Sequence, residues 1–311
     1  MDQQTSQPAR KSSNSRFTLS KALTRPGLFR VWERMGFHLT PVHFYQPIPD
    51  TRDLPESIWS RRSAPTGLEV NLDAMGETLD GFKREFGAEY DALPRQEQSP
   101  HGFFLENKRY ETVDAEVCYC FVRSRKPRRI IEVGSGFSSI LMLDALALNE
   151  RDGKPGELLT IDPYPFERLQ GVRRDNFRVE KIPVQSAPLS HFESLERGDI
   201  LFIDSSHVSC IGSDVTFEIL EILPRIKPGV LVHIHDIFLP AEYPRKWVMQ
   251  WHRFWNEQYM LQAFLAFNSA FRVKMANHWL HLERPDVLKR AFSSYGREGD
   301  APGSIWIERV A

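Results

Sequence analysis

Residues 128–148 combine an apolar stretch, a turn with two glycines and a helix-forming segment. The apolar stretch ends at Glu132 and Val133, the turn is Gly134-Ser135-Gly136, and the helix-forming segment is 140–148. Glycine suits both turn positions because it accepts a positive φ and lets a ligand approach the backbone without a Cβ in the way. Free N–H groups at the start of the helix can donate to a polar ligand group. The pattern predicts a strand–turn–helix unit of an α/β sheet with a nucleotide-type cofactor site.

Glu132 and Ser139 distinguish two kinds of cofactor that such a turn can hold. Dinucleotide-binding proteins use G-x-G-x-x-G, in which the third glycine allows close packing over a pyrophosphate. Here Ser139 occupies the third position, and a carboxylate at Glu132 would repel a pyrophosphate. A carboxylate suits a ligand that carries positive charge, such as the ammonium and sulfonium of S-adenosylmethionine. The turn therefore favours S-adenosylmethionine, and a nicotinamide-dependent oxidoreductase stays as an alternative.

Three further apolar stretches end in an acidic residue. They are 158–162, 199–204 and 229–236, and they end at Asp162, Asp204 and Asp236. Helix-length segments separate them, which predicts alternating strands and helices and a parallel sheet. Ligands bind at the carboxyl ends of strands in such sheets, so these acids and Glu132 are expected at one edge. Asp162 stands where a ribose diol is held by two charge-assisted hydrogen bonds.

Composition and charge exclude several classes of protein. The formal net charge of −1 over 311 residues argues against a nucleic-acid partner, because such proteins usually carry a strong basic excess. The sequence has no apolar run of about 20 residues, so we expect no transmembrane helix. Segment 1–20 is polar, has no apolar core of a signal peptide, and is expected to be a disordered tail. We expect a cytoplasmic protein.

The chain divides into three expected regions: the tail 1–20, an N-terminal cap or lid 21–110, and an α/β domain 111–311. Apolar residues at helical spacing predict helices around 79–93 and 111–124. Three tryptophans four residues apart predict another helix, and two β-like segments, 270–281 and 303–310, follow. The tryptophans are Trp247, Trp251 and Trp255.

Four motifs together resemble the class I S-adenosylmethionine-dependent methyltransferases. They are E-V-G-S-G-F-S-S, T-I-D-P, D-I-L-F-I-D-S-S-H and H-I-H-D-I-F, and the resemblance covers about 111–311. It implies a Rossmann-like, mostly parallel seven-stranded sheet of order 3-2-1-4-5-7-6, with an antiparallel last hairpin and helices on both faces. It also implies that the cofactor-binding residues are Glu132, Gly134, Ser135, Gly136, Asp162, Ser186, Ala187 and Asp204. Within the class, the chain looks like bacterial small-molecule and sugar O-methyltransferases.

Methyl transfer to a hydroxyl requires removal of a proton, by a general base or with the help of a metal ion. His207 follows Asp204 closely, and its imidazole is the candidate base because the unperturbed pKa of histidine is about 6.5. A divalent metal such as Mg²⁺ held by Asp204, His235 and Asp236 is the alternative. His233 is expected to be buried with a satisfied hydrogen bond. Related metal-dependent enzymes often carry more carboxylates at these positions, which weakens the magnesium hypothesis.

The acceptor is expected to be a small molecule or a glycan. His43, Tyr45 and Tyr243 lie in proline- and aromatic-rich segments that can cover the cofactor edge, so they are candidate substrate-binding residues. A catalytically degenerate methyltransferase fold that only binds a partner is the non-enzymatic alternative. The sequence leaves open whether the protein is a homo-oligomer.

Overall fold

The computed structural model describes residues 22–63, 66–296 and 301–311, and it separates into two units, 1–58 and 59–311. In the first unit, helix α2 (Pro26–Arg34) has no buried residue and is followed by an irregular path. Three consecutive rings contact one another on that path, with centroids 4.2 Å apart for His43 and Phe44 and 4.3 Å for Phe44 and Tyr45. The irregular path agrees with the closely spaced prolines of this segment.

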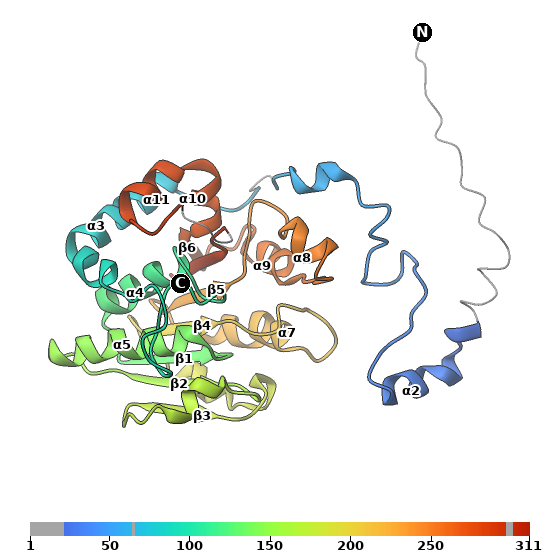
Figure 1. The fold of residues 1–311 in the computed structure, drawn as a ribbon, viewed down its shortest axis with the longest axis horizontal. Coiled ribbons are helices and arrows are strands. Elements are labelled where there is room, and N and C mark those ends of the chain that lie inside the picture. The colour runs from blue at the N-terminus through green and yellow to red at the C-terminus, as the bar shows by residue number, and fades with distance from the viewer. Residues whose placement is uncertain (1–21, 64–65, 297–300) are drawn as a thin grey trace, which may run out of the picture. The chain divides into compact units, whose positions relative to one another are not determined.

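The second unit is built on a seven-stranded sheet (Figure 1). Its strands are β1 (Arg129–Val133), β2 (Glu157–Ile161), β3 (Phe177–Glu180), β4 (Ile200–Ile203), β5 (Leu231–His235), β6 (Phe271–Ala276) and β7 (Ser304–Arg309). The strand order is β3-β2-β1-β4-β5-β7-β6. Strands β1 to β5 pair in parallel, whereas β7 is antiparallel to both β5 and β6. The expected order and the antiparallel last hairpin are confirmed.

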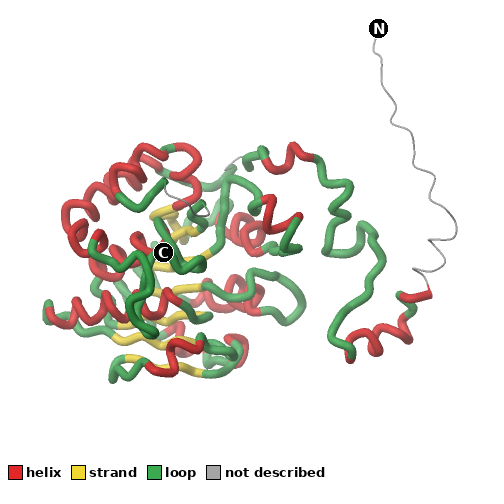
Figure 2. Tube along the Cα trace, in the orientation of Figure 1, coloured by secondary structure: helices red, strands yellow, loops and turns green. Residues whose placement is uncertain are grey.

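Helices surround this sheet (Figure 2). They are α3 (Leu72–Asp91), α4 (Asp114–Arg125), α5 (Phe137–Arg151), α6 (Leu189–Glu193), α7 (Asp214–Phe217), α8 (Arg245–Met249), α9 (Glu257–Leu265), α10 (Asn277–Glu283) and α11 (Pro285–Ala291). Helix α4 packs between α3 and α5, and α11 packs on α3. The helices predicted around 79–93 and 111–124 correspond to α3 and α4. Helix α3 therefore belongs to the unit that contains the sheet, although it lies within the segment expected as a cap.

Two predicted elements are different in the structure. The expected tryptophan helix is wrong, because α8 ends at Met249 and Trp251 and Trp255 lie in the loop that follows. The three indole rings surround the guanidinium of Arg253, and these tertiary contacts outweigh the helical spacing. The β-like segment 270–281 is a strand only as far as Ala276.

The second half of that segment is helix α10, and a buried polar contact explains where the strand ends. Asn277 Nδ2 donates to Asp114 Oδ1 (2.8 Å) and to Ser304 Oγ (3.0 Å). These bonds fix the first residue of α10 against the starts of α4 and β7. Because both bonds come from the buried Nδ2 group of Asn277, they favour one backbone arrangement at this point of the chain.

Candidate active site

The turn after β1 requires glycine at its first position. Gly134 has φ of +85°, and a Cβ built on it would lie 1.9 Å from the carbonyl oxygen of Asp204. The backbone after β4 therefore passes directly against this glycine. Gly136 is different, because its φ of −173° is extended and a Cβ would meet only atoms of Ser138, the nearest being Oγ at 3.7 Å. The expectation of a positive φ at Gly136 was wrong.

Glu132 ties β1 to the start of α5. Its fully buried carboxylate accepts hydrogen bonds from the hydroxyls of Ser138 (2.7 Å), Ser139 (2.6 Å) and Thr160 (2.7 Å). Burial raises the pKa of Glu132 to about 7, although these three hydrogen bonds favour the ionised form. The side chain that was expected to face a cationic ligand thus supports the glycine turn in this structure.

Ser135 and Asp162 bring the first two strand ends together. The hydroxyl of Ser135 donates to Asp162 Oδ2 (2.5 Å) and accepts from the backbone N–H of Phe166 (2.8 Å). The second carboxylate oxygen, Oδ1, accepts from the backbone N–H of Tyr164 (2.7 Å). The residues expected to hold the methionine end and the ribose therefore adjoin each other. The expected adenine residues, Ser186 (exposed) and Ala187 (buried), lie in the loop after β3.

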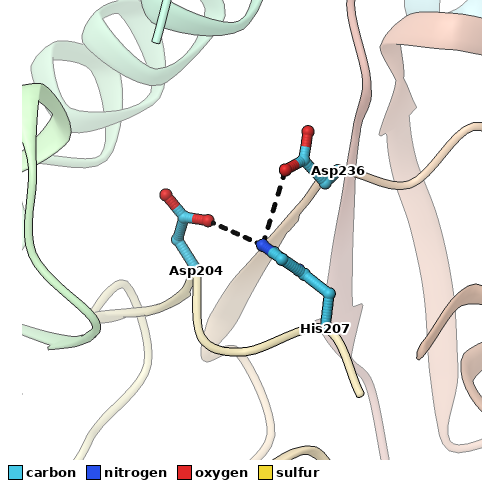
Figure 3. A group of neighbouring side chains, drawn as sticks. All are labelled: Asp204, His207 and Asp236. Atoms are coloured by element: carbon cyan, nitrogen blue, oxygen red, sulfur yellow. Dashed lines mark ion pairs between the residues drawn. The ribbon is translucent and has the colours of Figure 1, made fainter. Parts of the chain in front are cut away.

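A cluster of two carboxylates and an imidazole lies at the ends of β4 and β5 (Figure 3). Nε2 of His207 is 3.3 Å from Asp204 Oδ1 and 3.4 Å from Asp236 Oδ2. Both His207 (φ +62°) and Asp236 (φ +55°) have left-handed backbone conformations, which non-glycine residues seldom adopt. The chain thus turns sharply after both strands, and these turns direct the three side chains toward one another.

Glu257 completes the cluster from the first residue of α9. Its Oε2 accepts from Nδ1 of His207 at 2.8 Å, and the Glu257 side chain is 1% exposed. Backbone bonds from Asn256 N and Glu257 N to the His207 carbonyl oxygen, 3.1 and 3.3 Å, fix the two segments together. No sequence motif marks Glu257, and the analysis of the sequence missed it.

The charges of this cluster determine the protonation of His207. Burial favours the neutral ring, but hydrogen bonds to Asp204 and Glu257 and the charge of Asp236 outweigh burial and raise the pKa of His207 well above its ordinary value. Burial also opposes ionisation of Asp204, yet the charge of His235 and the bond from His207 lower the pKa of Asp204 to about 2. Without a bound metal ion, this cluster therefore favours the imidazolium form of His207.

The same cluster has the donor atoms of a metal site. One donor atom from each of Asp204, His207 and Asp236 can be chosen so that all three lie within 4.8 Å of one another. Two carboxylate oxygens and an imidazole nitrogen suit a hard or borderline divalent cation. His235, the imidazole expected in this role, lies outside the group, with its Nε2 3.7 Å from Asp236 Oδ1.

His233 is an internal residue of the sheet. Its ring stacks on Phe202 (centroids 4.1 Å apart) and packs on Trp306 (4.5 Å), and its side chain is fully buried. Neither ring nitrogen has a hydrogen-bond partner among the described residues, so the expected satisfied hydrogen bond is wrong. Burial lowers the pKa of His233 well below its ordinary value, which keeps the ring neutral.

A cavity of about 420 Å³ opens beside the cluster. Its lining includes Asp204, His235 and Asp236 from the cluster edge, three cationic residues, and the three tryptophans around Arg253. Tyr243, a candidate for substrate binding, is 2% exposed, and its hydroxyl accepts from the backbone N–H of Gln258 (3.2 Å). Tyr243 therefore packs in the wall behind the cavity. His43 and Tyr45 belong to the other unit and stay candidates by sequence alone.

A seven-stranded sheet of this order, with a glycine turn after β1 and acids at the strand ends, has the architecture of a methyltransferase domain. Residues 131–237 match the family of that description, methyltransferase domain. A protein of uncharacterised function from Archaeoglobus fulgidus is 30% identical over 187 residues, which are 56% of this chain and 82% of that protein. Residues 131–237 therefore belong to a methyltransferase domain, and the sheet that contains them has the strand order of the class I methyltransferase fold.

Solved structures of low sequence identity are also similar to the chain. The O-methyltransferase TomG from Streptomyces achromogenes is 16% identical, with a TM-score of 0.41 over 78% of this chain and 92% of TomG. An O-methyltransferase from Bacillus cereus is 15% identical, with a TM-score of 0.38 over 75% of this chain and 90% of that chain. Within the described residues, no helix is both long and apolar enough to cross a membrane.

Proposed function

We propose that the protein transfers the methyl group of S-adenosylmethionine to a hydroxyl of a small-molecule acceptor. The observation that carries this proposal is the cluster of Asp204, His207 and Asp236, which lies beside a cavity at the same sheet edge as the glycine turn. The backbone of Asp204 touches that turn, so the cofactor loop and the cluster share one residue. This adjacency is what methyl transfer needs, because the acceptor atom must be held in line with the donor.

In this proposal, the turn and the loop after β2 hold the cofactor. Gly134, Ser135 and Gly136 offer backbone groups to the methionine end, and Asp162 accepts from the ribose hydroxyls. The Ser135 hydroxyl now bonded to Asp162 can rotate away when a ribose occupies that carboxylate. Glu132 acts through the turn, whose position it fixes with three hydroxyl contacts. Ser186 and Ala187 would hold the adenine.

The cluster holds the acceptor hydroxyl and receives its proton. His207 is protonated when the cluster contains no metal, so it has no free lone pair with which to act as a base. Asp204, His207 and Asp236 would hold a divalent cation, and such an ion lowers the pKa of a bound hydroxyl. With a dication bound there, the imidazolium form of His207 would be disfavoured, and its Nε2 would be free as a ligand or as a base. Glu257 keeps the proton on Nδ1 and so directs the Nε2 lone pair toward the two aspartates.

Two other functions make different predictions. A degenerate binding protein would not need an imidazole held by three carboxylates beside a cavity, so the cluster favours an enzyme. A nicotinamide-dependent oxidoreductase would bind a pyrophosphate at this turn. Here the side chains of Glu132 and Ser139, hydrogen-bonded to each other, flank the turn instead. Ser139 donates its hydroxyl to Glu132, and its side chain fills the place of the third glycine.

Titration calorimetry with S-adenosylmethionine, S-adenosylhomocysteine and NAD⁺ tests the cofactor. We expect the first two to bind and NAD⁺ not to bind; the reverse result would refute the proposal. Transfer of tritiated methyl to a panel of sugars, phenols and hydroxy acids then tests the reaction, with Mg²⁺, with Mn²⁺ and with EDTA. Cofactor binding without transfer to any acceptor in the presence of metal would support the degenerate alternative.

A further inference from the structure

We propose that the methyl acceptor carries an anionic group, a carboxylate or a phosphate, which Arg253 binds inside the cavity beside the cluster. This inference rests on the proposed function, because it names the class of acceptor for that reaction. The lining of the cavity includes the acids Glu111, Asp114, Asp204 and Asp236 and the cationic residues Lys108, Arg109 and Arg253. An acceptor in this cavity can thus contact both the carboxylates of the candidate metal site and cationic side chains.

Arg253 is held in place by aromatic rings. Its guanidinium carbon lies 4.9 Å from the ring centroids of Trp247 and Trp251 and 4.8 Å from that of Trp255. Its backbone N–H donates to the carbonyl oxygen of Trp247 at 2.9 Å. Contacts of this kind fix a guanidinium through its π faces and leave its N–H groups, which lie in the plane, able to donate.

These donors have no carboxylate partner within the part of the chain that the structure describes. Arg253 forms neither an ion pair nor a side-chain hydrogen bond there, although most arginines of this protein that are similarly enclosed do. Arg123 is the matched case, since it bonds to Glu89 and Asp152. A guanidinium that is fixed, half-buried and unpaired is a preorganised anion site, because little ordering entropy is lost on binding.

The other charges of the cavity are consistent with an anionic ligand. Lys108 and Arg109 likewise have no ion pair among the described residues, and the Arg109 guanidinium lies 5.7 Å from the ring of Phe166. The buried acid Asp114 already accepts hydrogen bonds from Gly303 N (2.9 Å), Ser304 Oγ (2.5 Å) and an amide of α10. Glu111 also lines the cavity, and its Oε1 accepts a hydrogen bond from the backbone N–H of Lys108 at 2.9 Å. The other carboxylates of the lining are Asp204 and Asp236 of the cluster, which a metal ion would neutralise.

A pair of probes that differ only in charge tests the inference. The full-length protein is first saturated with S-adenosylhomocysteine and Mg²⁺. It is then titrated with 3,4-dihydroxybenzoate or with 3,4-dihydroxybenzamide, and binding is followed by the intrinsic tryptophan fluorescence of the protein. We expect the carboxylate to bind at least about 10-fold more tightly than the amide, as for one charge-assisted hydrogen bond. In Arg253→Gln, this preference should fall below about threefold.

Control variants distinguish a specific contact of Arg253 with the anion from a general change in the packing of the three tryptophans around it. Lys246→Gln is the matched control, because the Lys246 ammonium lies over the Trp251 ring at 4.6 Å but does not line the cavity. It should keep the full preference for the carboxylate, and Arg253→Lys should keep part of it. Competition by acetate and by inorganic phosphate shows which anion the site prefers.

The outcomes distinguish this inference from the proposed function. Equal affinity of both probes for the wild type, no binding of either, or an undiminished preference in Arg253→Gln would overturn the anionic acceptor. If S-adenosylhomocysteine itself fails to bind in the first step, the proposed function fails and this inference fails with it. Binding of S-adenosylhomocysteine without a preference for the carboxylate refutes this inference alone.

Discussion

Glu257 accepts a hydrogen bond from Nδ1 of His207 at 2.8 Å, across 50 positions of the sequence. The contact links the loop after β4 to the first residue of α9 and leaves Nε2 directed at Asp204 and Asp236. A carboxylate behind an imidazole fixes both the orientation and the tautomer of the ring. The pair therefore makes α9 part of the proposed active site.

Replacing Glu257 by glutamine should reduce methyl transfer without reducing cofactor affinity. An amide cannot hold the Nδ1 proton as a carboxylate does, so we expect kcat to fall by about 10- to 100-fold. Titration with S-adenosylhomocysteine should give a dissociation constant within about twofold of the wild type. Glu242→Gln is the control, because Glu242 bonds to Tyr259 and Gln258 and not to His207. Unchanged turnover in Glu257→Gln would show that the buried carboxylate has no part in catalysis.

The two glycines of the turn should respond differently to alanine. Gly134→Ala places a Cβ 1.9 Å from a carbonyl oxygen and strains a φ of +85°, so the Tm should fall by roughly 5 °C or more. Gly136→Ala meets nothing closer than 3.7 Å and should keep a Tm within about 2 °C of the wild type. Thermal unfolding of both variants without ligand measures this contrast. Equal losses for the two would contradict the geometry of the turn.

Asp162→Asn should weaken binding of both S-adenosylmethionine and S-adenosylhomocysteine. Loss of a charge-assisted hydrogen bond costs about 1.5–3 kcal/mol, which is a factor of roughly 10 to 150 in the dissociation constant. Calorimetry measures the change, and Asp144→Asn, whose carboxylate pairs with Arg174 on the outer surface of α5, is the control. An unchanged affinity of Asp162→Asn for both cofactors would contradict the proposal that Asp162 binds the ribose.

The stability of the cofactor-free protein should depend on pH through Glu132. Its folded pKa of about 7 lies above the ordinary 4.5, so the native state binds a proton that the unfolded chain releases. The resulting stabilisation is complete below the lower value and is lost as the pH rises through about 7. The full difference is on the order of 3 kcal/mol.

Glu132→Gln isolates this contribution. The free energy of unfolding of the wild type, measured relative to that of Glu132→Gln by urea titration, should decrease between pH 4.5 and 7.5. A constant difference over this range would show that the three hydroxyl donors keep Glu132 ionised in the folded protein.

Asp236→Asn should reduce both metal affinity and turnover. Removing one of two carboxylates leaves the cluster with less negative charge for a dication, so we expect methyl transfer to fall by a factor of order 10² to 10⁴. EDTA should abolish methyl transfer by the wild type, and added Mg²⁺ or Mn²⁺ should restore this activity. An enzyme indifferent to EDTA would leave His207 to act without a metal.

The sequence by itself determined the sheet and showed that the candidate site lies at the carboxyl ends of its parallel strands. Apolar stretches that end in Glu132, Asp162, Asp204 and Asp236 are local features, and each predicts a strand end without knowledge of its neighbours. A parallel sheet has only one carboxyl edge, so the acids necessarily gather there. The glycine motif likewise predicted the turn after β1, whereas the contact of Ser135 with Asp162 appeared only in the structure.

Only the tertiary structure decided what the side chains at that edge do. His207 was expected as an ordinary imidazole, but carboxylates from three separate segments surround it, and their combined charge changes its protonation. Glu257 and Arg253 carry no motif, since their roles arise from contacts that a chain forms only when distant segments meet. Trp251 and Trp255 lie in a loop and not in the predicted helix for the same reason. Their packing around the Arg253 guanidinium stabilises the loop more than their helical spacing stabilises a helix.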